Sequence, residues 1–276
     1  MKTILHLVSD LHLERSSEDH MKITKLNILL NKLHKKKGEI HILAAVGDIS
    51  NVRHQSFNLF FEKVSPLYDH ILYVPGNHEY YNDYHVENKL SMKKILDEMK
   101  KIINNYPNVK ILDNNSIIIN DYKFIGTTLW SNVDESSKDY IREHINDYHL
   151  IHTEKGLLTI ADTNNFNKKN IKWLVSELKT DIPCIVLSHH APLFNDPENN
   201  NYTADPKYTR SKNNCAFHNN LKVLLKKPII LWTFGHTHYC TNFILNGIHI
   251  ISNQLGYENE ITDFNPDMSI DLDIIL

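Results

Sequence analysis

Apolar residues recur along this chain in two different periods, and segments of one period alternate with segments of the other. Short apolar runs typical of buried strands cover Ile4 to Ser9, Ile40 to Val46, Ile71 to Val74, Ile182 to Leu187 and Ile229 to Phe234. Apolar positions repeat at helical spacing in Ile23 to Leu33, Phe57 to Val64, Met92 to Ile103 and Ile171 to Leu178. This alternation predicts an α/β or α+β architecture.

The pattern changes between Val109 and Thr127, where short strand-like runs are separated by turn residues. The runs are Val109 to Leu112, Ser116 to Ile119 and Tyr122 to Thr127, and Asn-Asn and Asn-Asp pairs divide them. We expect these three strands to pair antiparallel. A further hairpin is predicted around Asn246-Gly247, between the runs Asn242 to Leu245 and Ile248 to Ile251.

Two long polar segments, Ser131 to Asn170 and Ala191 to Asn214, interrupt the alternation. Loops of that length in a compact domain are usually functional or disordered. We therefore expect both segments to be loops that face the substrate.

Composition and charge narrow the class of protein. The chain has 276 residues, of which 41% are hydrophobic and 23% charged, and its formal net charge is -3. These values exclude a disordered or collagen-like chain and predict one globular domain over 1–276. Without a basic excess, a nucleic acid is not the favoured partner and a membrane surface is not expected.

The three cysteines, Cys184, Cys215 and Cys240, are far apart and form no Cys-x-x-Cys pair. Neither a disulfide framework nor a thiolate zinc site is therefore indicated. The apolar run at the start of the sequence is too short for the hydrophobic region of a secretory signal. No apolar stretch approaches the length of a membrane span. We expect a soluble intracellular protein located in the cytoplasm.

Side chains that commonly bind metals follow five of the predicted strands. In chain order, the five strands are followed by these motifs, one each: Asp10 with His12, Gly47-Asp48, Gly76-Asn77-His78-Glu79, His189-His190 and Gly235-His236-Thr237-His238. Asp10 and His12 are two positions apart, so in extended backbone both point to the same side. The sequence therefore predicts a cluster of metal-type side chains at one end of a sheet.

Chance matches limit what a single motif means in a chain with 18 histidines. About one Asp-x-His is expected from composition alone, and three are present, at Asp10, Asp83 and Asp147. Gly-Asn-His-Glu is expected only about 0.003 times. In addition, Gly47, Gly76 and Gly235 each precede a candidate ligand, where a sharp turn needs a permissive backbone. The ordered set, rather than any one motif, carries the signal.

The order of these motifs resembles that of the calcineurin-like metallophosphoesterase superfamily, and the match spans Asp10 to His238. The resemblance implies a four-layer αββα sandwich of two mixed β-sheets flanked by helices, with a binuclear metal centre at the strand ends. It assigns one metal ion to Asp10, His12, Asp48 and His238. It assigns the other to Asp48, Asn77, His189 and His236, so that Asp48 bridges the two ions.

The resemblance also implies a mechanism, and the residue types suit it. Oxygen and imidazole donors without a thiolate suit Mn, Fe or Zn and do not decide among them. Two divalent ions would lower the pKa of a bridging water to about 7, which makes a hydroxide nucleophile available at Asp48 near neutral pH. His78 resembles the general acid of the family, and with Asn77 it would contact the substrate. The predicted reaction is hydrolysis of a phosphate monoester or diester, most simply of a small molecule.

One departure from the family pattern concerns the residues after Gly47-Asp48. In the branch of Ser/Thr protein phosphatases this motif continues to an Asp and an Arg, whereas this chain has Asn51 and Val52. Protein phosphatase activity is therefore not expected. The alternatives are a binding scaffold that keeps the fold without catalysis, and a nuclease of the same superfamily.

Overall fold

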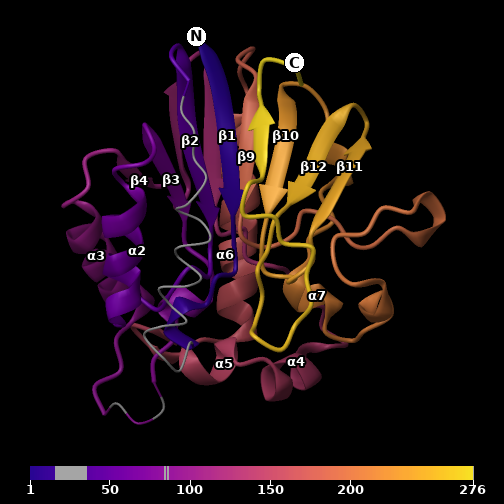
Figure 1. The fold of residues 1–276 in the computed structure, drawn as a ribbon. Coiled ribbons are helices and arrows are strands. Elements are labelled where there is room, and N and C mark those ends of the chain that lie inside the picture. The colour runs from indigo at the N-terminus through magenta and orange to yellow at the C-terminus, as the bar shows by residue number, and fades with distance from the viewer. Residues whose placement is uncertain (16–35, 84, 86, 276) are drawn as a thin grey trace.

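Two β-sheets pack face to face, and helices cover their outer surfaces (Figure 1). The computed structural model of the protein describes residues 1–15, 36–83, 85 and 87–275. In spatial order, the first sheet contains β13 (Ser269–Asp271), β1 (Lys2–Val8), β2 (Glu39–Val46), β3 (His70–Val74) and β4 (Val109–Ile111). The second contains β11 (Thr241–Leu245), β12 (Ile248–Ser252), β10 (Ile229–Phe234), β9 (Cys184–Ser188), β6 (Tyr122–Thr127) and β5 (Asn115–Ile119). A small separate hairpin joins β7 (His152–Thr153) and β8 (Gly156–Leu157).

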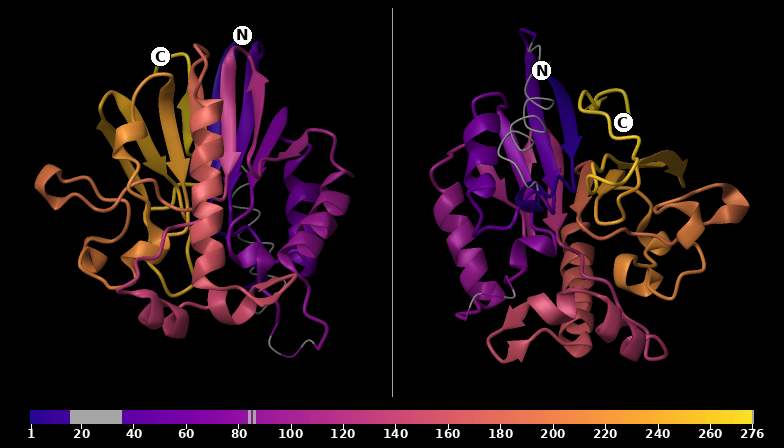
Figure 2. Two further views of the ribbon diagram at one scale, coloured as in Figure 1. Left: turned by 180° about the vertical axis from the view of Figure 1, so that it is seen from behind. Right: turned by 60° about the horizontal axis from the view of Figure 1, so that its bottom comes forward.

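The helices lie on the outer faces of the sheets and around one end of them (Figures 1 and 2). They are α2 (Gln55–Val64), α3 (Met92–Ile103), α4 (Lys138–His144), α5 (Asp147–Leu150), α6 (Ile160–Glu177) and α7 (Asn214–Phe217). Short 3-10 turns are η1 (Leu13–Arg15), η2 (His78–Tyr80), η3 (Pro197–Asn199), η4 (Pro206–Tyr208) and η5 (Lys222–Leu224). Among the described residues, no helix is long and apolar enough to cross a membrane.

The central strands are apolar on both faces because each face is buried. In β2, Ile42 and Ala44 pack between the two sheets, whereas Leu43 and Ala45 pack under the helices. β1, β2 and β3 are parallel neighbours, as are β6, β9 and β10. Parallel strands covered on both sides produce continuous apolar runs rather than alternation. The four-layer sandwich of two mixed sheets expected from the sequence is therefore confirmed.

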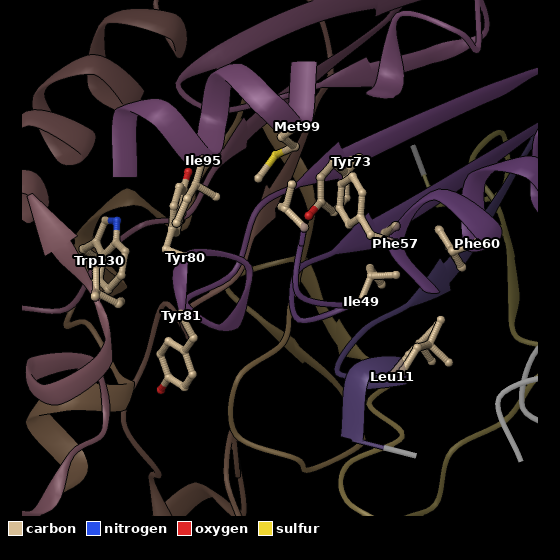
Figure 3. Close-up of a cluster of buried hydrophobic side chains, with 14 of the residues drawn as sticks. Leu11, Ile49, Phe57, Phe60, Tyr73, Tyr80, Tyr81, Ile95, Met99 and Trp130 are labelled. Carbon is tan, nitrogen blue, oxygen red and sulfur yellow. The ribbon is translucent and has the colours of Figure 1, made fainter. Parts of the chain in front are cut away.

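The outer face of the first sheet is covered by α2 and α3. Figure 3 shows Phe57 and Phe60 of α2 and Ile95 and Met99 of α3 gathered around Tyr73 of β3. All five side chains are buried. Burial of side chains of this size contributes roughly 1.5–3 kcal/mol each. This layer holds the loops that follow β1, β2 and β3 against a rigid base.

One prediction about the region after α3 is wrong. We expected Val109 to Leu112 to pair antiparallel with the two strands that follow it, but β4 pairs parallel with β3 at the edge of the first sheet. Because α3 connects β3 to β4, the segment is a βαβ unit, which requires parallel strands. β5 and β6 do pair antiparallel as expected, but in the second sheet.

The polar segment Ser131 to Asn170 is not simply a loop. It contains α4, α5, the β7–β8 hairpin and the first half of α6, which begins at a Thr159–Asp162 capping box. The buried stripe of α6 is mostly polar and consists of Thr163, Asn167, Asn170 and Leu174. The Asn167 amide donates to the Trp130 carbonyl at 2.6 Å. Apolar periodicity predicts only the end of this helix, from Ile171, and misses its first part because hydrogen bonds, not apolar contacts, attach much of that part.

The remaining elements differ from expectation in smaller ways. The other strands and helices expected from the pattern are present with ends shifted by a few residues, and β13, which pairs with β1, was not predicted. The helical pattern Ile23 to Leu33 lies outside the described residues. The segment Ala191 to Asn214 contains η3 and η4 and no strand, in agreement with a loop.

Candidate metal centre

The carboxyl ends of five strands meet at one end of the two sheets. β1, β2 and β3 are parallel neighbours in one sheet, and β9 and β10 are parallel neighbours in the other. The arrowheads of β1 and β10 mark this end in Figure 1. The segments that follow these strands carry every residue for which the sequence predicts a role at the centre: Asp10, His12, Asp48, Asn77, His78, His189, His236 and His238.

Asp10, His12 and His238 form a first cluster, in which one candidate ligand atom from each residue lies within 4.8 Å of the others. Nε2 of His12 is 3.0 Å from Nε2 of His238, which is 3.5 Å from Oδ1 of Asp10. The Ser9 hydroxyl and the backbone N–H of His236 both donate to the Asp10 carboxylate. These contacts fix the orientation of Asp10 within the cluster.

Asp48, His189 and His236 form a second cluster of the same kind. Nε2 of His189 is 3.3 Å from Oδ1 of Asp48 and 3.0 Å from Oδ1 of Asn77. The other oxygen of Asp48, Oδ2, lies 3.9 Å from Nε2 of His12 in the first cluster. The two oxygens of Asp48 therefore face different clusters, as a carboxylate shared by two cations would.

The donor atoms fit divalent metal ions. Ligands about 2.0–2.1 Å from a tetrahedral zinc ion lie roughly 3.3 Å apart, and the separations within the two clusters bracket this distance. Nδ1 of His189 donates to the Val46 carbonyl at 2.9 Å, and Nδ1 of His238 lies 2.5 Å from Oε2 of Glu260. These contacts leave Nε2 of both imidazoles for a metal ion.

Electrostatics also favours a cation at this place. Burial opposes the ionised form of Asp48, but the His189 and His78 imidazoles outweigh it and hold its pKa well below the usual range. Burial likewise opposes the charged form of His238, yet hydrogen bonds to Asp10 and Glu260 raise its pKa to about 10. The buried carboxylates of Asp10 and Asp48 and the exposed carboxylate of Glu260 thus stabilise positive charge here, whether on an imidazole or on a metal ion.

Five of the predicted ligands have a left-handed backbone, which residues other than glycine rarely adopt. Their φ angles are 54° for Asp10, 44° for His12, 53° for Asp48, 71° for His236 and 50° for His238. Such conformations cost of order 1–3 kcal/mol each and persist only where surrounding contacts fix them. Strain concentrated in one cluster of polar residues is typical of a functional site.

Gly47, Gly76 and Gly235 are needed for two different reasons. Gly47 has a φ of 94°, in agreement with the expected sharp turn. Gly76 does not have a positive φ, but a Cβ there would collide with Oδ1 of Asp48 and with the His189 ring. Gly235 is similarly crowded. Close packing of the candidate ligands therefore explains all three glycines, and a permissive backbone conformation is needed in addition only at Gly47.

Glu79, the last residue of Gly-Asn-His-Glu, ties two of the loops together. Its carboxylate accepts backbone N–H groups from Gly76 at 2.8 Å, Asp48 at 3.0 Å and Ile49 at 2.8 Å. Burial is the main cause that raises its pKa, to about 8. The motif drew attention to this position, but no pattern in the sequence assigns it this role.

Three further residues at the site were missed. Glu14 lies 3.5 Å from Nδ1 of both His12 and His78, and the Tyr257 hydroxyl lies 3.2 Å from Nε2 of His78. Asp147 accepts from Asn77 Nδ2 at 2.8 Å and from the Tyr81 hydroxyl at 2.6 Å. Asp147 belongs to one of the Asp-x-His matches that strand position did not support. Only Glu14, two residues after His12, follows a recognised motif closely enough to have been noticed.

A cavity of about 340 Å³ opens beside the two clusters. Asp48, Asn77, His78, His236 and His238 line its inner side. Its outer side is formed by residues 144–147 and by residues between 204 and 218, which include parts of both polar segments expected to face the substrate. Among the described residues that line it, none is a lysine or an arginine.

His190 and Tyr80 lie behind the centre rather than in it. The His190 ring packs between Trp130, with centroids 5.3 Å apart, and His236, with centroids 4.1 Å apart. Tyr80 and Tyr81 both belong to the buried cluster on the outer side of the first sheet (Figure 3). Of the two, only Tyr81 also lines the cavity. None of the His and Asp clusters found among the described residues includes His190.

Comparison with protein families finds one model that covers most of the chain. The model is that of the calcineurin-like phosphoesterases, and it matches residues 4–240. An uncharacterized protein of Acanthamoeba polyphaga mimivirus is 46% identical over 280 residues, which cover 99% of this chain and 98% of that protein.

Among solved structures, the fold is similar to that of phosphopantetheinyl hydrolase from Mycobacterium tuberculosis. The TM-score is 0.71, with coverage of 93% of this chain and 90% of the other. The sequences are only 14% identical, so this similarity concerns the fold alone.

Proposed function

Because this chain belongs to the calcineurin-like phosphoesterase family and is a hydrolase of phosphate esters, we propose that it acts through a centre of two divalent metal ions. The observation that carries this proposal is the meeting of two His and Asp clusters across a single carboxylate, Asp48. One cluster without the other would suffice for a single ion only.

The ligands follow from the two clusters. Asp10, His12, Asp48 and His238 would hold one ion, and Asp48, Asn77, His189 and His236 the other. Asn77 is supported as a ligand through its oxygen, because Oδ1 lies 3.0 Å from Nε2 of His189 while Nδ2 donates to Asp147. When bound, the ions would supply an activated water at neutral pH and positive charge that attracts the phosphate. The donor set suits Mn, Fe or Zn alike.

His78 would act as the general acid toward the leaving oxygen. Its side chain borders the cavity, and its Nε2 lies 4.0 Å from Oδ2 of Asp48. Burial lowers its pKa, but Asp48 and Glu14 outweigh that effect and raise it, which favours the protonated form. Asn77 also lines the cavity, so both residues would contact the substrate. General acid catalysis of this kind contributes about 10²- to 10⁴-fold in rate.

The cavity favours a small phosphate ester over a polynucleotide. Proteins that bind nucleic acids neutralise several phosphates with lysine and arginine, and the described residues that line this cavity include neither. A phosphopantetheinyl ester, the substrate class in the name of the structurally similar hydrolase, is one candidate to include in a substrate panel.

Metal analysis and ester hydrolysis test the proposal together. We expect about two ions per chain in protein purified without chelator, and turnover of p-nitrophenyl phosphate or its bis-p-nitrophenyl diester with Mn²⁺. The variant Asp48→Asn should lose metal, and His78→Ala should keep metal but lose about 10²- to 10⁴-fold in turnover. His249→Ala, in β12 away from the centre, is the matched control.

The outcomes separate the alternatives. Metal without turnover of any ester in the panel would favour a binding scaffold, and cleavage of oligonucleotides in preference to small esters would favour a nuclease. If no metal binds under any loading condition, the assignment of the ligands is wrong.

A further inference from the structure

The two ring nitrogens of His78 face different groups. Nε2 lies 3.2 Å from the Tyr257 hydroxyl and 4.0 Å from Oδ2 of Asp48, on the side of the cavity. Nδ1 lies 3.5 Å from Oε1 of Glu14 on the opposite side. The ring is buried, so its orientation is set by these neighbours rather than by water.

Glu14 is placed to contact two imidazoles at once. Its Oε1 is 3.5 Å from Nδ1 of His12 as well as from Nδ1 of His78. Its other oxygen, Oε2, accepts the backbone N–H of Asn51 at 3.3 Å. The carboxylate is therefore held at one end by the loop after β2 and points its other end between a predicted metal ligand and the predicted acid.

The place of Glu14 Oε1 distinguishes the two nitrogens of each ring. Oε1 makes no shorter polar contact among the described residues, and the groups that face it are Nδ1 of His12 and Nδ1 of His78. A carboxylate oxygen in this place favours hydrogen on the nitrogen of each ring that faces it. Nε2 of His12 is then directed at the metal centre, and Nε2 of His78 at the cavity.

We propose that Glu14 is a positioning residue that holds His78 with its Nε2 toward the leaving oxygen and couples this ring to the ligand His12. The inference rests on the proposed role of His78 as the acid. It assigns Glu14 a contribution to the chemical step in addition to any effect on metal binding, because Oε1 contacts the predicted acid His78 as well as the predicted ligand His12.

Asn51 has a different task. It occupies the position where protein phosphatases of the superfamily have an Asp, but its Nδ2 donates to the Tyr81 carbonyl at 2.6 Å and lies 3.5 Å from the His78 carbonyl. Its side chain therefore fixes the backbone of η2. The carboxylate beside the His78 ring comes instead from η1, through Glu14.

Leaving-group dependence tests the proposal, because a general acid matters most for poor leaving groups. The measurement is kcat for p-nitrophenyl phosphate and for phenyl phosphate, with metal content determined for each protein. We expect Glu14→Gln to keep its metal, to lower kcat for phenyl phosphate about 10- to 100-fold and to change kcat for p-nitrophenyl phosphate much less. Glu14→Asp, which keeps the charge on a shorter side chain, should show a weaker form of the same pattern.

Glu260→Gln is the matched control, since Glu260 contacts Nδ1 of the ligand His238 and not His78. It should affect both esters equally. If Glu14→Gln and Glu14→Asp also lower both equally, Glu14 acts only through the metal site and the proposal is overturned. His78→Ala separates failure of this proposal from failure of the proposed function. If His78→Ala lowers kcat equally for p-nitrophenyl phosphate and phenyl phosphate, the acid role of His78 itself is wrong.

Discussion

Nε2 of His12 and Nε2 of His238 face each other at 3.0 Å, although 226 positions separate the two residues in the chain. Nδ1 of His12 lies 3.5 Å from Glu14, and Nδ1 of His238 lies 2.5 Å from Glu260. Two imidazole nitrogens that face each other at this distance need a proton or a metal ion between them. The first cluster is thus built to enclose positive charge.

Metal binding should therefore stabilise the folded protein. A ligand that binds only the native state at 100 times its Kd contributes about 2.7 kcal/mol. We expect Mn²⁺ to raise Tm by several degrees over chelator-treated protein, measured by calorimetry. His12→Ala should lose most of this increase, whereas His249→Ala should retain it. An equal Tm with and without metal would contradict a native-state metal site.

Gly76→Ala should disable the centre without unfolding the protein. The new Cβ would displace Asp48 or His189, and misplacement of a catalytic group by about 1 Å can cost 10²-fold in rate. We expect weaker metal binding and at least about a 10²-fold loss of ester hydrolysis. The control is Gly38→Ala, before β2: its φ of 90° makes an alanine strained, but a Cβ there meets no atom within 4 Å, so the variant should lose some stability and keep its metal content. Normal metal content in Gly76→Ala would show that the loop adapts.

The candidate ligands could be predicted from the sequence because each follows a strand directly. A ligand such as Asp48 needs only its own strand to be recognised, and the rarity of Gly-Asn-His-Glu anchors the series. Glu14 could not be assigned in the same way, since its contact with His78 depends on how the loops after β1 and β3 meet. Tyr257 reaches the site from a loop after β12 with no motif around it.

The fold shows a similar division. Strands such as β2 were predictable because both faces are apolar. The first part of α6 was not, because it attaches through Asn167 and Asn170, and inward-facing polar side chains leave no apolar period in the sequence. The partner of each strand also depends on the connection rather than on the strand itself. β4 joined the first sheet because α3 returns the chain parallel to β3.

The layer between the two sheets should carry much of the stability. Phe124 of β6 is fully buried there, packed among apolar residues of both sheets. We expect Phe124→Ala to lower the free energy of unfolding by about 3–5 kcal/mol, measured by urea denaturation. Ile118→Ala on the neighbouring edge strand is the control, because Ile118 is 56% exposed and should cost far less. Similar losses in both variants would argue against a packed layer at Phe124.

Stability should fall in mild acid because of His218. Its side chain is buried, and Nδ1 donates to the Asn214 carbonyl at 3.0 Å. Burial lowers the pKa of His218 to about 4, whereas an unfolded histidine titrates near about 6.5. The unfolded chain thus binds this proton more tightly. The contribution of neutral His218 to the free energy of unfolding is complete above about pH 6.5 and is lost progressively as the pH falls toward about 4.

Denaturation by urea at pH 7 and pH 4.5 measures this effect. From pH 7 to pH 4.5, we expect the free energy of unfolding to drop by about 2–3 kcal/mol more in the wild type than in His218→Asn, whose amide does not titrate. The comparison isolates His218, because the other titrating groups are shared and their contributions largely cancel between the two proteins. Equal losses in both proteins would mean that His218 accepts a proton in the folded state as readily as in the unfolded chain.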